Sequence, residues 1–263
     1  MNILLGTLAL RPYVFAFLAA FLVAGVADLG WRRTFRFGAW VWALAWLAEY
    51  SSTRTGVPFG LYHYTGTTQG QELYLADVPV MDSLSFTFLA YASFCLARAS
   101  LDPRRAPRPV VAGLAGALMM LLDVVIDPVA VRGDQWFLGR IFYYPAGGLY
   151  FGVPLSNFAG WWLVGALGVG GYLYWSGGRE RWGRRPWPGV ALYYGVLGFN
   201  LVMTAWIGEW PLFAAGLALH GLLGTGLWMV HRAGESTRSS GGVAAAILGG
   251  GIGRGVKPPS ESK

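Results

Sequence analysis

Seven apolar stretches separated by short polar loops limit what this chain can fold into more than any other feature. A helix needs about 20 mainly apolar residues to cross the hydrocarbon core of a bilayer. The stretches lie at residues 12–29, 38–50, 78–97, 110–125, 155–175, 190–207 and 212–230, and the second is short and rich in Trp. Only 13% of the residues are charged, whereas a soluble domain has about 25%. The sequence therefore predicts an all-α, polytopic membrane helix bundle with about seven transmembrane helices.

The basic residues are concentrated in alternate loops. Lys and Arg in short loops mark the cytoplasmic side of a membrane protein. One set of loops, with the C-terminal tail, holds sixteen of the 20 basic residues: Arg32, Arg33, Arg36, Arg98, Arg104, Arg105, Arg108, Arg179, Arg181, Arg184, Arg185, Arg232, Arg238, Arg254, Lys257 and Lys263. The other set holds Arg11, Arg54, Arg132 and Arg140. This alternation predicts a multi-pass protein of the cell (plasma) membrane, with its N-terminus outside and its C-terminus in the cytoplasm. The net charge of +7 follows this topology, so nucleic acid is not an expected partner.

The chain is predicted to have one membrane-embedded domain, residues 1–234, and a cytoplasmic tail, residues 235–263. The tail is rich in Gly and Ser and contains Lys257-Pro258-Pro259 near its end, so it is expected to be disordered. The first residues lack a clear apolar segment with an A-x-A cleavage site, which indicates a lead into the first helix rather than a removable signal peptide. The single cysteine, Cys95, excludes an intrachain disulfide and a multi-cysteine metal site.

Most of the acidic residues lie on or near the predicted outer side. Acidic residues contribute little to membrane orientation, and carboxylates at membrane depth are costly, so they suggest function. Eight of the 13 belong to this group: Glu49, Glu72, Asp77, Asp82, Asp123, Asp127, Asp134 and Glu209.

The strongest candidate site is the pair formed by Asp123 and Asp127. Residues four apart share one face of a helix, and two close carboxylates in a low-dielectric site cannot easily both ionise, so the pair is expected to keep a proton at neutral pH. Pro128 disfavours helical geometry at Asp127, which predicts a helix break facing protein or a cavity. The alternative is structural: the pair caps an interfacial turn or bonds to Arg132.

Glu49 ends the second apolar stretch and is a further candidate. The loop after it, residues 51–64, mixes turn residues with aromatics and would suit a lid at the interface. The structural alternatives are an ion pair between Glu49 and Arg54 and a belt of interfacial tyrosines. His63 has no second His or Cys at metal-ligand spacing, so a surface position is expected for it.

Asn157 lies near the start of the fifth apolar stretch, after a Gly- and Pro-rich segment. It would either cap that helix or hold a water or another polar group in a site. Phosphate loops, dinucleotide fingerprints, Ser-His-Asp arrangements and C-x-x-C motifs are not visible in the sequence. A cofactor-free reaction or simple transport therefore fits better than redox chemistry.

Three blocks in this order resemble the CruF-type carotenoid 1′,2′-hydratases, a membrane family that includes bisanhydrobacterioruberin hydratase. They are Glu49 followed by TGVPFGLYHY at 55–64, DxxxDP at 123–128, and GxYFGVPxxNxxGW at 148–161. The resemblance extends over residues 40–210. It implies an enzyme, a hydro-lyase of carotenoid biosynthesis that adds water across the terminal double bond of an acyclic carotenoid.

This chemistry suggests a role for each candidate residue. Asp127 or Asp123 is the expected acid, and the other of the two, or Glu49, is the expected base for the attacking water. The expected substrate-binding residues are Tyr62, Tyr64, Trp136, Tyr150 and Asn157. The implied substrates are a lycopene- or γ-carotene-like pigment and water, met within the bilayer. Neither a cofactor nor a metal is expected, and contact with other carotenoid enzymes is a further expectation.

The alternative function is a small transporter or proton-coupled channel. A transporter of this kind usually has repeated halves with broken helices, and this sequence shows no such repeat. A retinal-binding photoreceptor would need a lysine in the last helix, but Lys257 and Lys263 are the only lysines and both lie in the tail.

Overall fold

The computed structural model describes residues 2–101, 106–177, 182–226 and 229. Their contacts divide the chain into two units, Met1–Gly221 and Leu222–Lys263. In the second unit the described residues, 222–226 and 229, are helical. The predicted disordered tail, 235–263, lies outside the described residues.

The first unit is mostly helical, as predicted. Its helices are α1 (Ile3–Leu10), α2 (Pro12–Leu29), α3 (Trp31–Thr55), α4 (Val80–Ser100), α5 (Arg108–Ala130), α6 (Leu155–Trp175) and α7 (Trp187–Trp206), followed by a further helix at 210–221. The bounds of α2 and α6 coincide with the predicted stretches. The predicted lead into α2 is itself a short helix, α1, whose C-cap is Arg11.

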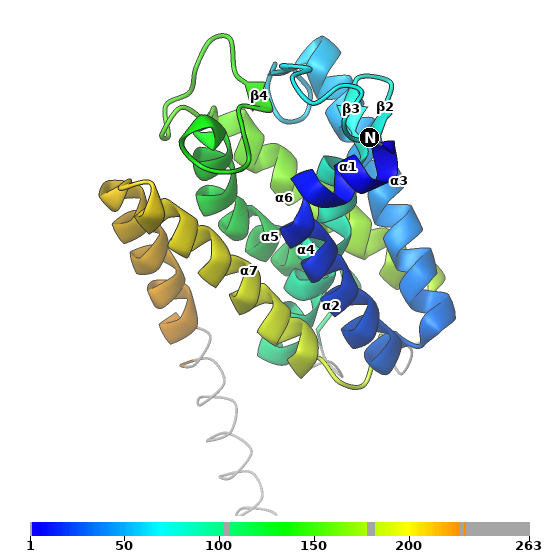
Figure 1. The fold of residues 1–263 in the computed structure, drawn as a ribbon. Helices are drawn as coiled ribbons and strands as arrows, with labels where there is room; N and C mark the ends of the chain where they lie inside the picture. The colour runs from blue at the N-terminus through cyan, green and yellow to red at the C-terminus, as the bar shows by residue number, and fades with distance from the viewer. Residues whose placement is uncertain (1, 102–105, 178–181, 227–228, 230–263) are drawn as a thin grey trace, which may run out of the picture. The chain divides into compact units, whose positions relative to one another are not determined.

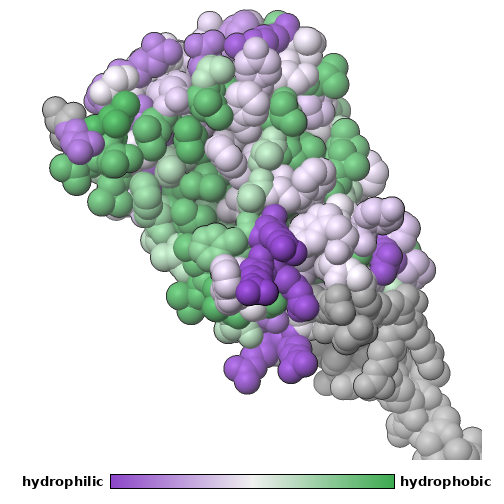
Figure 2. Space-filling model, turned by 90° about the vertical axis from the view of Figure 1, so that its right-hand side faces the viewer, coloured by the Kyte–Doolittle hydropathy of each residue, from purple (hydrophilic) through white to green (hydrophobic). Residues whose placement is uncertain are grey.

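Four helices of the described chain, α2, α4, α5 and α7, are long and apolar enough to cross a membrane. Large apolar side chains such as Val23 on α2 and Val202 on α7 are exposed, as expected of surfaces that face lipid. Figure 2 shows apolar side chains over much of the middle of one face, with hydrophilic side chains gathered above and below them. The count of seven spans and the orientation of the termini remain predictions.

Helix α4 forms the centre of the first unit. It packs against α2, α3, α5, α6 and α7, and its residues from Phe86 to Arg98 are all buried. Because α4 is enclosed on all sides, its small polar side chains, Ser83, Thr87 and Ser93, are buried together with its apolar ones.

Helices α5 and α6 pack closely because glycines face each other across their interface. A Cβ atom at Gly116 would lie 2.4 Å from the carbonyl oxygen of Trp162, and one at Gly165 would lie 3.0 Å from the Cα atom of Gly116. Small residues allow such close approach of membrane helices. The same antiparallel register brings Asp123 of α5 opposite Asn157 of α6, about two helical turns further along.

The loops at one end of the helices form a cap with four two-residue strands (Figure 1). Strand β1 (His63–Tyr64) pairs antiparallel with β4 (Phe142–Tyr143), and β2 (Tyr74–Leu75) pairs with β3 (Val78–Pro79). The first pairing joins the loop after α3 to the loop after α5. The all-α prediction is therefore corrected in this detail: the fold is mostly helical, with short strands in the cap.

The predicted helix break at Asp127 is wrong. Helix α5 continues through Pro128 to Ala130, and the amide of Val131 donates to the carbonyl of Asp127 at 2.9 Å. A proline removes one backbone donor from a helix. Because Pro128 lies close to the end of α5, the cost is limited to a single hydrogen bond. The helix therefore keeps the four-residue spacing of Asp123 and Asp127 on one face.

Candidate active site

A cavity lies beneath the cap, among α2, α3, α4, α5, α6 and α7. Most of its lining is aromatic or aliphatic, including Tyr13, Phe86, Trp136 and Trp161. Three carboxylates line it as well, those of Glu49, Asp82 and Asp127. The cavity thus combines an apolar body with several ionisable groups.

Asp127 and Asp123 share one amide donor. The Nδ2 atom of Asn157 lies 2.6 Å from Oδ2 of Asp123 and 2.7 Å from Oδ2 of Asp127. All three side chains are buried, but only Asp127 and Asn157 line the cavity. Asp123 therefore lies behind Asp127, and Asn157 fixes the two carboxylates relative to each other.

Two of the structural alternatives, a bond from Arg132 to the aspartate pair and a helix cap by Asn157, are not observed. Arg132 donates through Nε to Glu209 at 2.7 Å and through Nη1 to the carbonyls of Pro128 and Phe151, so it does not neutralise the pair. Asn157 does not cap α6, whose N-cap is Pro154 without a side-chain hydrogen bond.

Tyr144 and Trp161 direct polar groups toward Asp127. The hydroxyl of Tyr144 donates to Oδ2 of Asp127 over 3.4 Å, and the indole of Trp161 is a further hydrogen-bond partner. Burial and then the neighbouring carboxylate of Asp127 raise the pKa of the Tyr144 phenol far above its ordinary value. Tyr144 therefore remains a neutral donor across the physiological pH range.

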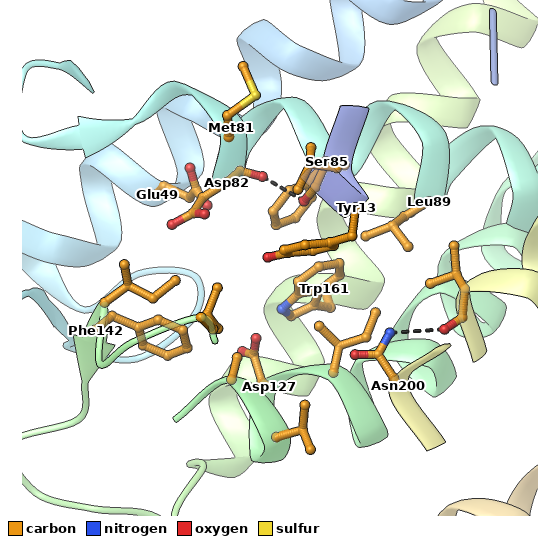
Figure 3. Close-up of a pocket in the computed structure, with 18 of the residues that line it drawn as sticks. Tyr13, Glu49, Met81, Asp82, Ser85, Leu89, Asp127, Phe142, Trp161 and Asn200 are labelled. Atoms are coloured by element: carbon orange, nitrogen blue, oxygen red, sulfur yellow. Dashed lines mark hydrogen bonds between the residues drawn. The ribbon is translucent and has the colours of Figure 1, made fainter. Parts of the chain in front are cut away.

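Glu49 lies on α3 and Asp82 on α4, and both line the cavity on the side away from Asp127 (Figure 3). The predicted alternative of a Glu49–Arg54 ion pair is wrong. Arg54 instead pairs with Asp77 at 3.2 Å and lies over the ring of Tyr50. Glu49 is buried, and its Oε2 atom has no hydrogen-bond partner among the described residues.

The predicted wall residues divide into those that line the cavity and one that does not. Tyr62, Tyr64 and Trp136 line it, and Tyr150 instead packs against Phe151 and Phe158. Burial first, and then the carboxylate of Glu49, raise the pKa of Tyr62 and Tyr64 well above the usual value of a phenol. Both therefore present neutral hydroxyls and aromatic faces.

Several cavity residues are not in the predicted site, among them Asp82, Tyr144, Trp161 and Asn200. Trp161 stands in the third sequence block and Asp82 begins the third apolar stretch, so both carried a signal in the sequence. Tyr144 and Asn200 carried none, because their approach to the cavity depends on tertiary packing. Among the described residues, no group of three or more His, Cys, Asp or Glu side chains could hold a metal ion.

These features define a membrane-helix protein with an aromatic cavity that contains buried acids. Comparison with known proteins gives the family: residues 2–223 match the model of the carotenoid biosynthesis protein family, and the chain belongs to it. It is 33% identical over 232 residues to bisanhydrobacterioruberin hydratase of Haloarcula japonica, an alignment that covers 83% of this chain and 74% of that protein. No solved structure matches the chain significantly. The resemblance seen in the sequence is thus confirmed at the level of the family.

Proposed function

We propose that this protein is a carotenoid 1′,2′-hydratase, which adds water to the terminal double bond of an acyclic carotenoid to give a tertiary alcohol. The observation that carries the proposal is Asp127, a buried acid of a carboxylate pair that faces an apolar, aromatic cavity. The similarity to a hydratase supports the reaction class. Membership of the carotenoid biosynthesis family supports the substrate class.

The proposed reaction has two steps. The carboxyl group of Asp127 gives its proton to C2′, where the π electrons of the alkene form the new C–H bond and leave a tertiary cation at C1′. A water oxygen then bonds to C1′ and releases one proton to a carboxylate. The substrate gains one H and one OH, and the number of protons in the cavity is unchanged. Before the next turnover a proton passes from the accepting carboxylate back to Asp127.

The geometry favours Asp127 over Asp123 as the donor. Asp123 has no surface in the cavity, so a proton shared by the pair reaches the substrate through Asp127. Asn157 orients both carboxylates, and the rings of Trp161 and Tyr62 supply electron-rich faces for the cation. Glu49, which faces Asp127 across the cavity (Figure 3), is the proposed base for the water.

The test of the reaction is the source of the oxygen. Membranes containing the protein, supplied with lycopene and ¹⁸O-labelled water but no nucleotide, should form a product heavier than lycopene by one water. The added oxygen should carry the label, because water is the only co-substrate. A product labelled from ¹⁸O₂ instead would identify a hydroxylase and overturn the proposal.

We also infer seven membrane spans, with the cap and the site on the outer side of the cell membrane. The inference rests on the arginine-rich loops at the opposite end of the helices. Reporter fusions after Gly30 and Arg185 should read cytoplasmic, and fusions after Gly70 and Gly133 should read external. An external signal at Arg185 would contradict this topology. Exchange of substrate and product with other carotenoid enzymes is expected to take place within the bilayer.

A further inference from the structure

The side of the cavity opposite Asp127 has two carboxylate oxygens without partners. Glu49 is 5% exposed, and neither its Oε2 atom nor Oδ2 of Asp82 has a hydrogen-bond partner among the described residues. Buried polar atoms are nearly always hydrogen-bonded, to protein or to ordered water. Both side chains line the cavity on the same side in Figure 3, and the charge of Asp82 acts on the carboxyl group of Glu49, so the two lie near each other.

The surroundings of Asp82 explain why one of its oxygens is directed to the cavity. Its other oxygen, Oδ1, lies 3.9 Å from Nη2 of Arg11. Arg11 is itself buried and fixed by two hydrogen bonds to Glu72, of 2.9 and 2.7 Å. The arginine therefore places its positive charge beside Oδ1 without a hydrogen bond to it, and Oδ2 has no hydrogen-bond partner among the described residues. The hydroxyl of Tyr64 approaches both carboxylates from the cap.

The chemistry of such a ligand is limited by what the two oxygens are. A close buried pair keeps one proton more easily than none, but an ionised carboxylate oxygen and the carbonyl oxygen of a protonated carboxyl both accept hydrogen bonds. The ligand must therefore present two donors within a small space beside an apolar cavity. A metal ion is not favoured, because the described residues place no third His, Cys, Asp or Glu at the site. Water has two donor hydrogens and a lone pair that remains available.

We propose that Glu49 and Asp82 together hold the water that attacks C1′, and that Asp82 is thereby a further catalytic residue of the hydration. The inference rests on the proposed function and extends it. The water donates one hydrogen bond to Oε2 of Glu49 and one to Oδ2 of Asp82. As its oxygen bonds to C1′, one of these carboxylates accepts the released proton.

This arrangement separates the two half-reactions in space. Asp127 delivers the proton from one side of the cavity, and the carboxylates of Glu49 and Asp82 supply the water from the other (Figure 3). The rings of Tyr13 and Trp161 lie between the two sides. The cation formed by Asp127 is thus met by a water that is already oriented, which reduces the entropic cost of the second step.

The separation can be tested by isotope exchange. When the cation is not captured by water, it returns a hydrogen of C2′ as a proton to the carboxylate of Asp127, and the alkene is restored. In D₂O this return leaves deuterium in recovered lycopene. Hydration and exchange therefore report separately on the water side and on the acid side of the cavity.

Asp82→Asn and Glu49→Gln should each lower hydration by about 10²-fold or more while deuterium exchange into lycopene persists. Asp127→Asn should lose both. Asp77→Asn is the matched control, since Asp77 is an exposed cap residue bound to Arg54, and it should retain both. Asp82→Ser is a second variant in case Asp82→Asn fails to accumulate. It leaves space for a water molecule but removes the carboxylate that would orient it.

Two results would overturn the proposal. The first is full hydration by both Asp82 variants. The second is loss of both hydration and deuterium exchange in variants that accumulate normally, which would place Asp82 on the acid side of the cavity. Hydration by wild-type membranes distinguishes a failure of this inference about Asp82 from a failure of the proposed function. If wild-type membranes form no hydrated lycopene, the hydratase assignment itself is wrong.

Discussion

Asp127→Asn is expected to remove nearly all hydration while the protein still accumulates in the membrane. The amide keeps the size of the carboxyl group and some of its hydrogen bonding, but it has no transferable proton. General acid catalysis contributes about 10²–10⁴-fold, and the rate of product formation from lycopene should fall by that factor. Asn is also less costly than a charged Asp at membrane depth, so the fold should tolerate the change.

Two further variants locate the effect. Asp123→Asn should also reduce the rate strongly, because it leaves Asp127 without the neighbour with which it shares a proton. Asp134→Asn, an exposed carboxylate in the cap, should have the wild-type rate. If Asp127→Asn kept more than roughly half of the wild-type rate, the loss would be far smaller than a missing acid produces, and the donor would have to be another group.

The second large effect is expected on stability, from Arg98→Met at the other end of the helices. Arg98 forms a buried ion pair with Asp28 and donates to the carbonyl of Trp182 at 2.7 Å. Asp28 also accepts from the amide of Arg185 at 2.7 Å and from the hydroxyl of Tyr91 at 3.2 Å. This group connects α2, α4 and the segment before α7. Removing one partner of such a pair costs about 3–5 kcal/mol, because it leaves a buried charge uncompensated.

The measurement is thermal unfolding of purified protein in detergent, with Arg54→Met as the control. Arg54 pairs with Asp77 at the surface, with side chains 38% and 77% exposed, and exposed pairs contribute little. Arg98→Met should lower the midpoint clearly, and Arg54→Met should leave it nearly unchanged. Equal midpoints for the two variants would show that the buried pair does not stabilise the fold.

The long helices could be predicted from the sequence because each depends on a continuous run of apolar residues. The least accurate bounds are those of α3, which begins at Trp31 rather than near 38. Its first turns contain Arg32, Arg33 and Arg36. A hydropathy scale scores an arginine as strongly polar, although the methylene groups of its side chain can lie along an apolar surface, so these turns were not included in the predicted stretch. The proline rule failed at Asp127 because tertiary packing of α5 outweighs a local preference at the helix end.

The candidate site was predictable where it depends on local spacing. Asp123 and Asp127 share a helix face by sequence alone, and Glu49 stands out as an acid at the end of an apolar stretch. Tyr144 reaches Asp127 from a loop. The proposed role of Asp82 in the site depends on Arg11, which lies between α1 and α2. Such long-range contacts depend on helix packing and on the cap, and no local pattern indicates them.

The two buried ion pairs have a consequence for the order in which the protein can assemble. Arg11 precedes its partner Glu72 by 61 residues, and Asp28 precedes Arg98 by 70. Chains are made at about 5–20 residues per second, so each early charge waits on the order of several seconds for its counter-charge. Until α4 has emerged, α2 must keep Asp28 at a hydrated boundary. A nascent chain interrupted before Glu72 has unpaired charges at both ends of α2, and one interrupted between Glu72 and Arg98 has an unpaired charge at Asp28.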